Sequence, residues 1–479
     1  MSDERAAPLG TGDRRQGKLA WMALFYLGLA VFIVVESYLL LIPHFPPNNA
    51  EIYSADRLMP FFPPLVLGAA VLALVSWFSR RLSSLPLALV GLLVVAIVAR
   101  LSYLYFRIGF ADMTVDPDVK LFFSYAQQLA QGTYPKMEYP QLALLYFWGA
   151  YSLAGGALDS FRIALPLLNL VCDLVVIACI WGVGLRCQSR QSAWLLALFV
   201  AVSPFSLILW FSKFDALPAA FFALSAYLFI ARREWLLGLA LAAGFYAKWF
   251  PALAVPIMWL YLLRRQEWGA LVKLSVALAA GMIAIGLPFW LADAERFLFT
   301  YHFHADRGAM AESIFYLPTY WLEPLHRLAP NAAPWDGFSS DIFTNSTTSL
   351  IQFATIGVIA LAALVAPGPR PRGLKLAALA VLAFIVLNRV FSPQYAVVML
   401  AAYALALCTR PLPRAALTAL VLACLVLTAA NMFVWPLLAS FWVTSSTVLF
   451  ALSLALCGVV VGTLFLPSHT SEPTAEVAH

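Results

Sequence analysis

Carboxylates cluster in a short polar stretch of a chain that is otherwise 63% hydrophobic. The stretch, DPDVKLFFSYAQQLAQGTYPKMEYPQL, runs from Asp116 to Leu142 and opens with two aspartates. Asp116 stands before Pro117 and fits a helix cap, so Asp118, at the second helical position, is less needed for capping. If one of these two carboxylates takes a proton during a reaction, we expect it to be Asp118, with Asp116 as the rival.

Further charged residues stand at turns and inside apolar runs. In WFSKFDALP, Asp215 lies at the tip of a tight turn, and Lys213 beside it forms a pair that can grip a sugar or a phosphate. The alternative for Asp215 is a solvated loop carboxylate. Lys248 lies inside an apolar run, where a cation is costly unless it reaches a partner, so it is a candidate functional residue. Glu138, next to Tyr139, is a candidate contact for an acceptor.

A later polar stretch, YHFHADRGAMAESIFYLPTYW, supplies His302, His304, Arg307 and Glu312. Two histidines two residues apart do not share a helix face, and the sequence has no HExxH motif, so we do not expect a zinc site. Arg307, and Arg389 in NRVFSPQYAVV, can each fork onto a phosphate at the membrane interface. Snorkelling of either side chain toward the lipid headgroups explains these arginines equally well.

The elements that must position these residues are membrane helices. The chain has 479 residues, of which 11% are charged, and its mean hydropathy is +0.85, whereas about a quarter of the residues of a soluble domain are charged. Apolar runs recur along it that can cross roughly 30 Å of hydrocarbon, a distance that takes about 20 helical residues. Because the runs lack the period-two alternation of barrel strands, we expect an all-α polytopic membrane protein.

The apolar runs cover residues 19–42, 60–79, 86–108, 162–185, 192–211, 214–231, 235–247, 249–263, 269–291, 348–366, 373–390, 394–409, 415–434 and 441–466. With these fourteen runs and a cytoplasmic N-terminus, the inner side receives the pairs Arg80/Arg81, Arg186/Arg190, Arg232/Arg233, Arg264/Arg265, Arg370/Arg372 and Arg410/Arg414. The expected divisions are a cytoplasmic tail (1–18), three helices (19–108), an outer catalytic loop (109–161), helices with a short broken hairpin (162–292), an outer loop (293–347), C-terminal helices (348–466) and a second cytoplasmic tail (467–479).

Three segments are expected to depart from simple crossing helices. The run from Leu142 to Gly156 is too short to span and should lie in, or dip into, the outer interface. The stretch 235–265 begins and ends beside inner arginines yet is too short for two full spans, so we expect two short helices broken around Lys248 and Pro251. The helix that starts at Asp116 should run to Gly132 on the outer membrane surface. Its apolar stripe is expected to be Leu121, Phe122, Tyr125 and Leu129.

The remaining charges and the cysteines narrow the class further. The net charge is +6, but the basic residues are divided among short loops, which membrane topology explains better than a nucleic-acid partner. The six cysteines have no metal-like spacing and imply no disulfide framework. Glu36, Arg100 and Asp173 are intramembrane charges without an obvious partner in the sequence, and Glu36 and Arg100 are candidates for a pair because both fall toward the outer ends of their runs.

Five stretches occur in an order similar to that of a known family: DVKLFFSYAQQLAQGTYPKMEYPQL, WFSKFDALPAA, GLALAAGFYAKWFPALAVPIMWL, HADRGAMAES and RVFSPQY. Between about residues 116 and 409 the chain thus resembles the GT-C superfamily of polyprenyl-phosphate-sugar glycosyltransferases, most closely the bacterial polyprenol-phosphate-mannose-dependent mannosyltransferases. It departs from that pattern by two extra spans within 19–108, by Ser212-Lys213-Phe214 in place of Gly-Gln, and by Tyr139-Pro140-Gln141 in place of Tyr-Pro-Pro.

The resemblance implies a GT-C-like bundle of about 14 transmembrane helices in the cell inner membrane, with both termini cytoplasmic and the active site on the outer face. It implies inverting transfer of a sugar, with mannose expected, from a polyprenyl-phosphate donor to a glycan or glycolipid, with Asp118 or Asp116 as base. No cofactor is required, and a divalent cation stays open. The expected substrate contacts are Glu138, Tyr139, Lys213, Asp215, Lys248, His302, His304, Arg307, Glu312, Arg389 and Gln394. A transporter or flippase of a lipid-linked sugar is the alternative function.

Overall fold

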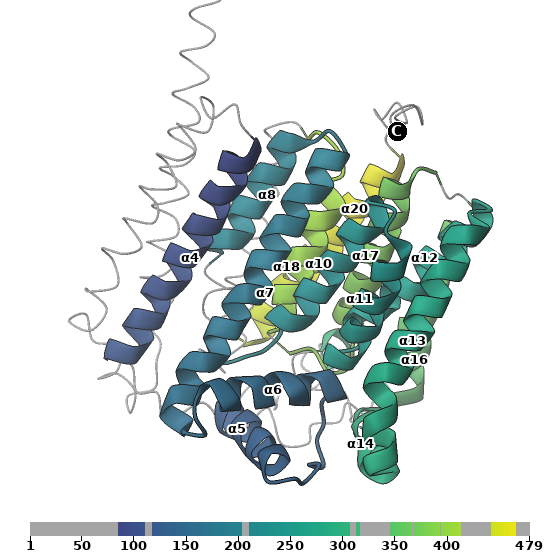
Figure 1. Cartoon of the computed structure of the whole chain (residues 1–479). Helices are drawn as coiled ribbons and strands as arrows, with labels where there is room; N and C mark the ends of the chain where they lie inside the picture. The colour runs from purple at the N-terminus through teal and green to yellow at the C-terminus, as the bar shows by residue number, and fades with distance from the viewer. Residues whose placement is uncertain are drawn as a thin grey trace, which may run out of the picture.

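The computed structural model describes residues 85–110, 117–203, 210–306, 313–316, 345–365, 368–392, 394–412 and 442–465. In these ranges the chain is all α, with 14 α-helices and short 3₁₀ segments (Figure 1). The apolar runs expected at 19–42, 60–79 and 415–434 lie outside the described residues, so the expected total of 14 spans stays a prediction.

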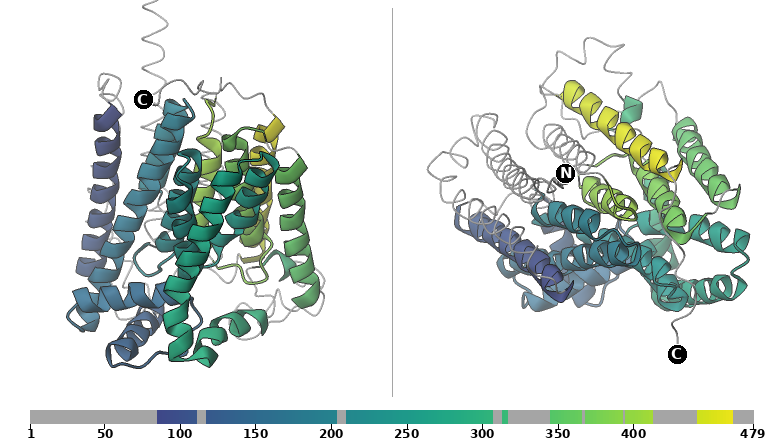
Figure 2. Two further views of the ribbon diagram at one scale, coloured as in Figure 1. Left: turned by 45° about the vertical axis from the view of Figure 1, so that its right-hand side comes forward. Right: turned by 90° about the horizontal axis from the view of Figure 1, so that it is seen from above.

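Most of the helices stand side by side in one bundle (Figures 1 and 2). They are α4 (Leu85–Phe110), α7 (Leu158–Arg186), α8 (Arg190–Val202), α10 (Ala216–Ile230), α11 (Glu234–Ala247), α12 (Ala254–Arg264), α13 (Trp268–Ala292), α16 (Asn345–Val365), α17 (Arg370–Val386), α18 (Tyr395–Leu407) and α20 (Trp442–Phe465). Four apolar segments, in α4, α7, α13 and α16, are long enough to cross a membrane, and they indicate a multi-pass membrane protein.

Three further helices gather at one end of this bundle, at the bottom of Figure 1. They are α5 (Pro117–Ala130), α6 (Gln141–Leu153) and α14 (Ala294–Asp306). Helix α6 covers most of the run that is too short to span, and it lies across the end of the bundle. Helix α14 was not expected, because its sequence lies in the stretch 293–347 that reads as an outer loop. Asp293 caps it by accepting a hydrogen bond from the Arg296 N–H at 3.0 Å.

The buried face of α5 differs from the expected stripe. Phe122 is buried as expected, but its buried neighbours on the helix are Val119 and Ala126, while Leu121, Tyr125 and Leu129 stay partly exposed. The small Ala126 lets α5 approach α6, and the ring of Phe122 stacks on that of Phe147 with 4.3 Å between centroids. Phe123 of α5 also contacts α6, with 5.3 Å between its ring centroid and that of Tyr151.

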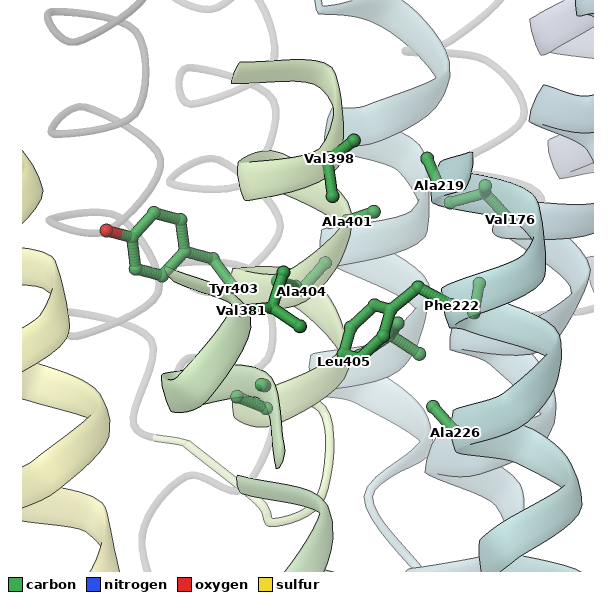
Figure 3. Close-up of a cluster of buried hydrophobic side chains, with 14 of the residues drawn as sticks. Val176, Ala219, Phe222, Ala226, Val381, Val398, Ala401, Tyr403, Ala404 and Leu405 are labelled. Carbon is green, nitrogen blue, oxygen red and sulfur yellow. The ribbon is translucent and has the colours of Figure 1, made fainter. Parts of the chain in front are cut away.

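Small side chains let the upright helices approach closely. Figure 3 shows this for α10 and α18, where Phe222 and Leu405 pack among Ala219, Ala226, Ala401 and Ala404. In the neighbouring contact between α11 and α13, a Cβ on Gly238 would lie 2.6 Å from the Leu274 carbonyl oxygen. Glycine is therefore required at this position by the spacing of the two helices.

The helix break expected around Lys248 is present. Helix α11 ends at Ala247, Lys248 is extended with φ −171° and ψ 143°, and the 3₁₀ segment η4 (Phe250–Leu253) leads into α12. Pro251 has no N–H to continue a helix ladder, and it packs on Gly244, where a Cβ would lie 2.6 Å from the Pro251 Cβ. The proline and the glycine thus fix the break that brings Lys248 out of helical geometry.

Charges at the other end of the bundle pair with one another. Helix α7 runs from the α6 end to Arg186, whose guanidinium donates to the Tyr227 hydroxyl. Arg370 at the start of α17 donates to the Phe229 carbonyl at 2.6 Å and forms ion pairs with Glu234 and Glu267. The arginine-bearing helix ends therefore gather opposite α5 and α6, as the grouping of basic loops predicts.

Within the bundle, Arg100 of α4 pairs with Asp173 of α7 at 2.6 Å, and both side chains are buried. Arg100 also donates to the Ala201 carbonyl at 2.7 Å, so the pair joins α4, α7 and α8. The suggested pairing of Arg100 with Glu36 stays a prediction, because Glu36 lies outside the described residues. A carboxylate that is buried without a cation is costly, so the Arg100 guanidinium offsets the desolvation of Asp173.

Candidate functional site

Two ion pairs lie where the crosswise helices meet the bundle. Asp118, in the first turn of α5, accepts a hydrogen bond from the Lys213 ammonium. Asp215 accepts one from the Lys248 ammonium at 2.7 Å. Lys213 and Asp215, which the sequence predicts as a joint contact for a sugar or a phosphate, thus each pair with a residue from a distant part of the chain. Whether they contact a substrate together stays a prediction.

The turn that carries Lys213 and Asp215 is held by Asn169 of α7. The Asn169 amide donates to the carbonyls of Trp210 at 2.7 Å and Lys213 at 2.6 Å, and its oxygen accepts from the Tyr146 hydroxyl of α6 at 2.8 Å. Asn169 is fully buried, so these bonds satisfy a side chain that would otherwise be costly in an apolar helix. The sequence offered one signal for it, an amide within the apolar run 162–185.

Aromatic rings lie close to the Lys248 ammonium. Its Nζ lies 4.6 Å from the centroid of the Tyr395 ring, 5.0 Å from that of Phe214 and 5.6 Å from that of Phe250. Such contacts stabilise a partly desolvated cation by about 0.5–2 kcal/mol each. The second carboxylate oxygen of Asp215, Oδ2, is buried and makes no hydrogen bond within the described residues.

The four charges differ in how far a substrate can reach them. The Asp118 side chain is 30% exposed, whereas that of Asp215 is 1% exposed. The lysines lie between, with 7% for Lys213 and 12% for Lys248. Asp118 is thus the carboxylate that an incoming group can meet, and Asp215 is the buried anchor of its lysine.

Tyr139 lies near Asp118, in a cluster of aromatic side chains. Burial raises its pKa well above the usual value of 10, and the nearby carboxylates of Glu138 and Asp118 raise it further. The phenol therefore stays protonated through the physiological range and can act as a hydrogen-bond donor. The rings around it belong to Phe122, Phe147 and Phe214, with centroids 5.7, 6.2 and 5.0 Å away.

The other residues that the sequence predicts as substrate contacts lie outside the two ion pairs. His304 meets the loop before α6 at the Glu138 carbonyl, 2.8 Å from its Nε2, and its own carbonyl accepts from Arg389 at 2.9 Å. Gln394 accepts from the Ser392 hydroxyl at 2.6 Å within the turn before α18. His302 is exposed on α14. Asp116, Arg307 and Glu312 lie outside the described residues.

The arrangement is suited to proton transfer beside fixed positive charge, since the accessible carboxylate of Asp118 is paired with the Lys213 ammonium. Among the described residues, no three His, Cys, Asp or Glu side chains lie close enough together to hold a metal ion. No family model matches the chain, and no curated protein matches it.

Proposed function

We propose that the protein is an integral membrane glycosyltransferase that moves a sugar, with mannose expected, from a polyprenyl phosphate to a hydroxyl of a glycan or glycolipid. The observation that carries the proposal is the partly exposed Asp118, paired with Lys213 beside the buried Asp215–Lys248 pair. A carboxylate fixed in this way is placed to act as a general base, while the neighbouring cations favour a phosphate.

The proposed reaction is a single displacement with inversion. The acceptor oxygen attacks the anomeric carbon, the bond from that carbon to the phosphate oxygen breaks, and the polyprenyl phosphate leaves with the electron pair. Asp118 takes the proton of the acceptor hydroxyl, and Asp116 is the rival for this role. Lys213 and Lys248 supply positive charge near the negative charge that grows on the leaving phosphate.

A lipid-linked donor is consistent with where the charges lie. The site is at the end of an apolar bundle, where a polyprenyl chain in the membrane can reach a polar group at the surface. The arginine-bearing helix ends gather at the opposite end, and arginines favour the cytoplasmic side. On this basis we assign the Asp118 end to the outer face of the cell inner membrane and both termini to the cytoplasm.

A transporter or flippase of a lipid-linked sugar is the second candidate, because the helix broken at Lys248 with a buried ion pair is also a transporter feature. The test is incubation of the purified protein in detergent with polyprenyl-phosphate mannose and a panel of glycan and glycolipid acceptors. Since detergent solution has no two compartments, sugar transfer there supports the enzyme. Absence of transfer, combined with movement of intact donor across proteoliposomes, overturns the enzyme and supports the transporter.

The same assay tests the base. Asp118→Asn keeps the size of the side chain but removes its basicity, so transfer should fall by about 10²–10⁴-fold while the protein still inserts and folds. Asp159→Asn is the matched control, because Asp159 begins α7 at the same end of the bundle with 94% of its side chain exposed. Full activity in Asp118→Asn would remove this residue from the role of base, and Asp116→Asn would then be assayed for it.

A further inference from the structure

One face of α14 is bonded to the loop that precedes α6. Arg296, Thr300 and His304 are spaced by four residues and so share a helix face. Their side chains meet the backbone carbonyls of Tyr134 for Arg296, of Met137 at 2.9 Å for Thr300, and of Glu138 at 2.8 Å for His304. A carbonyl can only accept, so His304 must carry a hydrogen on Nε2 to make its bond.

His304 touches two more segments of the site. The edge of its ring faces the Trp249 ring with 4.9 Å between centroids, and Trp249 adjoins Lys248 at the helix break. Its carbonyl, at the end of α14, accepts the hydrogen bond from Arg389. Arg389 begins the turn that leads to Tyr395, whose ring lies 4.6 Å from the Lys248 ammonium. His304 therefore contacts three of the segments near Lys248 and Tyr139: the loop before α6, the helix break and the turn before α18.

We propose that His304 is a positioning residue, which through its Nε2–H holds the loop 133–140 and thereby sets Tyr139 against Asp118 and Lys248. The sequence alone suggests a substrate contact for His304, but in the structure its Nε2 and its carbonyl oxygen bond to other parts of the chain. The consequence for sugar transfer rests on the proposed function, whereas the restraint on the loop does not. Two measurements therefore test the proposal, one of motion and one of catalysis.

The first measurement is hydrogen–deuterium exchange of peptides covering residues 133–140 in the full-length protein. His304→Leu should speed exchange there by about tenfold, the effect of one hydrogen bond worth roughly 1.4 kcal/mol. His304→Gln places an amide N–H near the position of Nε2 and should stay within about threefold of the unaltered protein. His302→Leu, on the exposed side of the same helix, is the matched control and should leave exchange unchanged.

The second measurement is the steady-state rate of sugar transfer. In His304→Leu, kcat should fall about tenfold with little change in KM, because the reacting groups are misplaced while the donor still binds, and His304→Gln should restore most of the rate. Thr300→Val, which removes the neighbouring hydroxyl, gives a second test of the loop restraint should His304→Leu not be recovered from membranes.

Unchanged exchange at 133–140 in His304→Leu, or in Thr300→Val where it takes that place, overturns the proposal. A loss in His304→Gln equal to that in His304→Leu also overturns it, because the Nε2–H would then not be the group that matters. If the unaltered protein transfers no sugar, the proposed function fails, and the exchange result alone supports or overturns the restraint by His304.

Discussion

Asp215 and Lys248 form the less exposed of the two ion pairs in the site. Removing one member leaves the other charge buried without compensation, so Asp215→Asn should destabilise the protein by about 3–5 kcal/mol, and Lys248→Met by a similar amount. The double variant Asp215→Asn/Lys248→Met should lose much less than the sum, because neither charge remains. Thermal unfolding in detergent measures all three, and additive losses would show that the two side chains are not coupled.

At the level of single residues, the sequence predicts four site charges, Asp118, Lys213, Asp215 and Lys248, and the structure joins them in two ion pairs. The sequence did not name these partners, because a pairing between residues 95 positions apart depends on how α5 folds back over the bundle. The sequence did not reveal the role of Asn169, which is to donate hydrogen bonds to two backbone carbonyls of the turn. The positions of backbone carbonyls depend on the fold of the turn, and residue types do not report them.

At the level of elements, long apolar runs predicted the upright helices well, since a helix that faces lipid must be apolar over its whole length. Helix α7, for example, spans Leu158–Arg186 where the apolar run covers 162–185. The break at Lys248 was also predictable, since Pro251 cannot continue a helix ladder. Helix α14 was not, because the side chains that it packs against the protein mix the polar Arg296, Thr300 and His304 with the aromatic Phe297 and Tyr301. A helix that packs through both kinds of side chain gives only a weak hydrophobic period.

The contact between α11 and α13 depends on Gly238. A methyl group there would lie 2.6 Å from the Leu274 carbonyl oxygen, which is backbone and cannot move aside without moving the helix. Gly238→Ala should therefore destabilise the protein by about 1–3 kcal/mol through overpacking, despite the better helix propensity of alanine. Gly357→Ala in α16 is the matched control, because nothing lies within 4 Å of its Cβ position, and it should be neutral or slightly stabilising. Thermal unfolding compares the two, and an equal effect would contradict the steric argument.

At the level of the whole molecule, charge is divided between the two ends of the bundle. One end carries the paired carboxylates and lysines of the candidate site together with the crosswise helices α5 and α6. The other carries the Arg370 cluster with Glu234 and Glu267, and the basic end of α7 at Arg186. The sequence predicts this division from the spacing of its arginines, because two successive apolar helices return the chain to the side from which it started. We propose that the arginine-rich end faces the cytoplasm, because arginine is preferred on that side of a membrane.

That orientation predicts the outcome of thiol labelling in intact cells. Two exposed residues are suitable for substitution by cysteine. Asp159 lies at the α5 and α6 end of the bundle, and Arg233 lies at the opposite end. A membrane-impermeant maleimide should label Asp159→Cys in intact cells and Arg233→Cys only in inverted vesicles. Background labelling of the cysteines in the described ranges should be low, because Cys172, Cys179, Cys187 and Cys408 are buried and Cys457 is partly buried. The reverse pattern would place the Asp118 end in the cytoplasm, where a nucleotide-linked donor would be available, and would contradict transfer on the outer face.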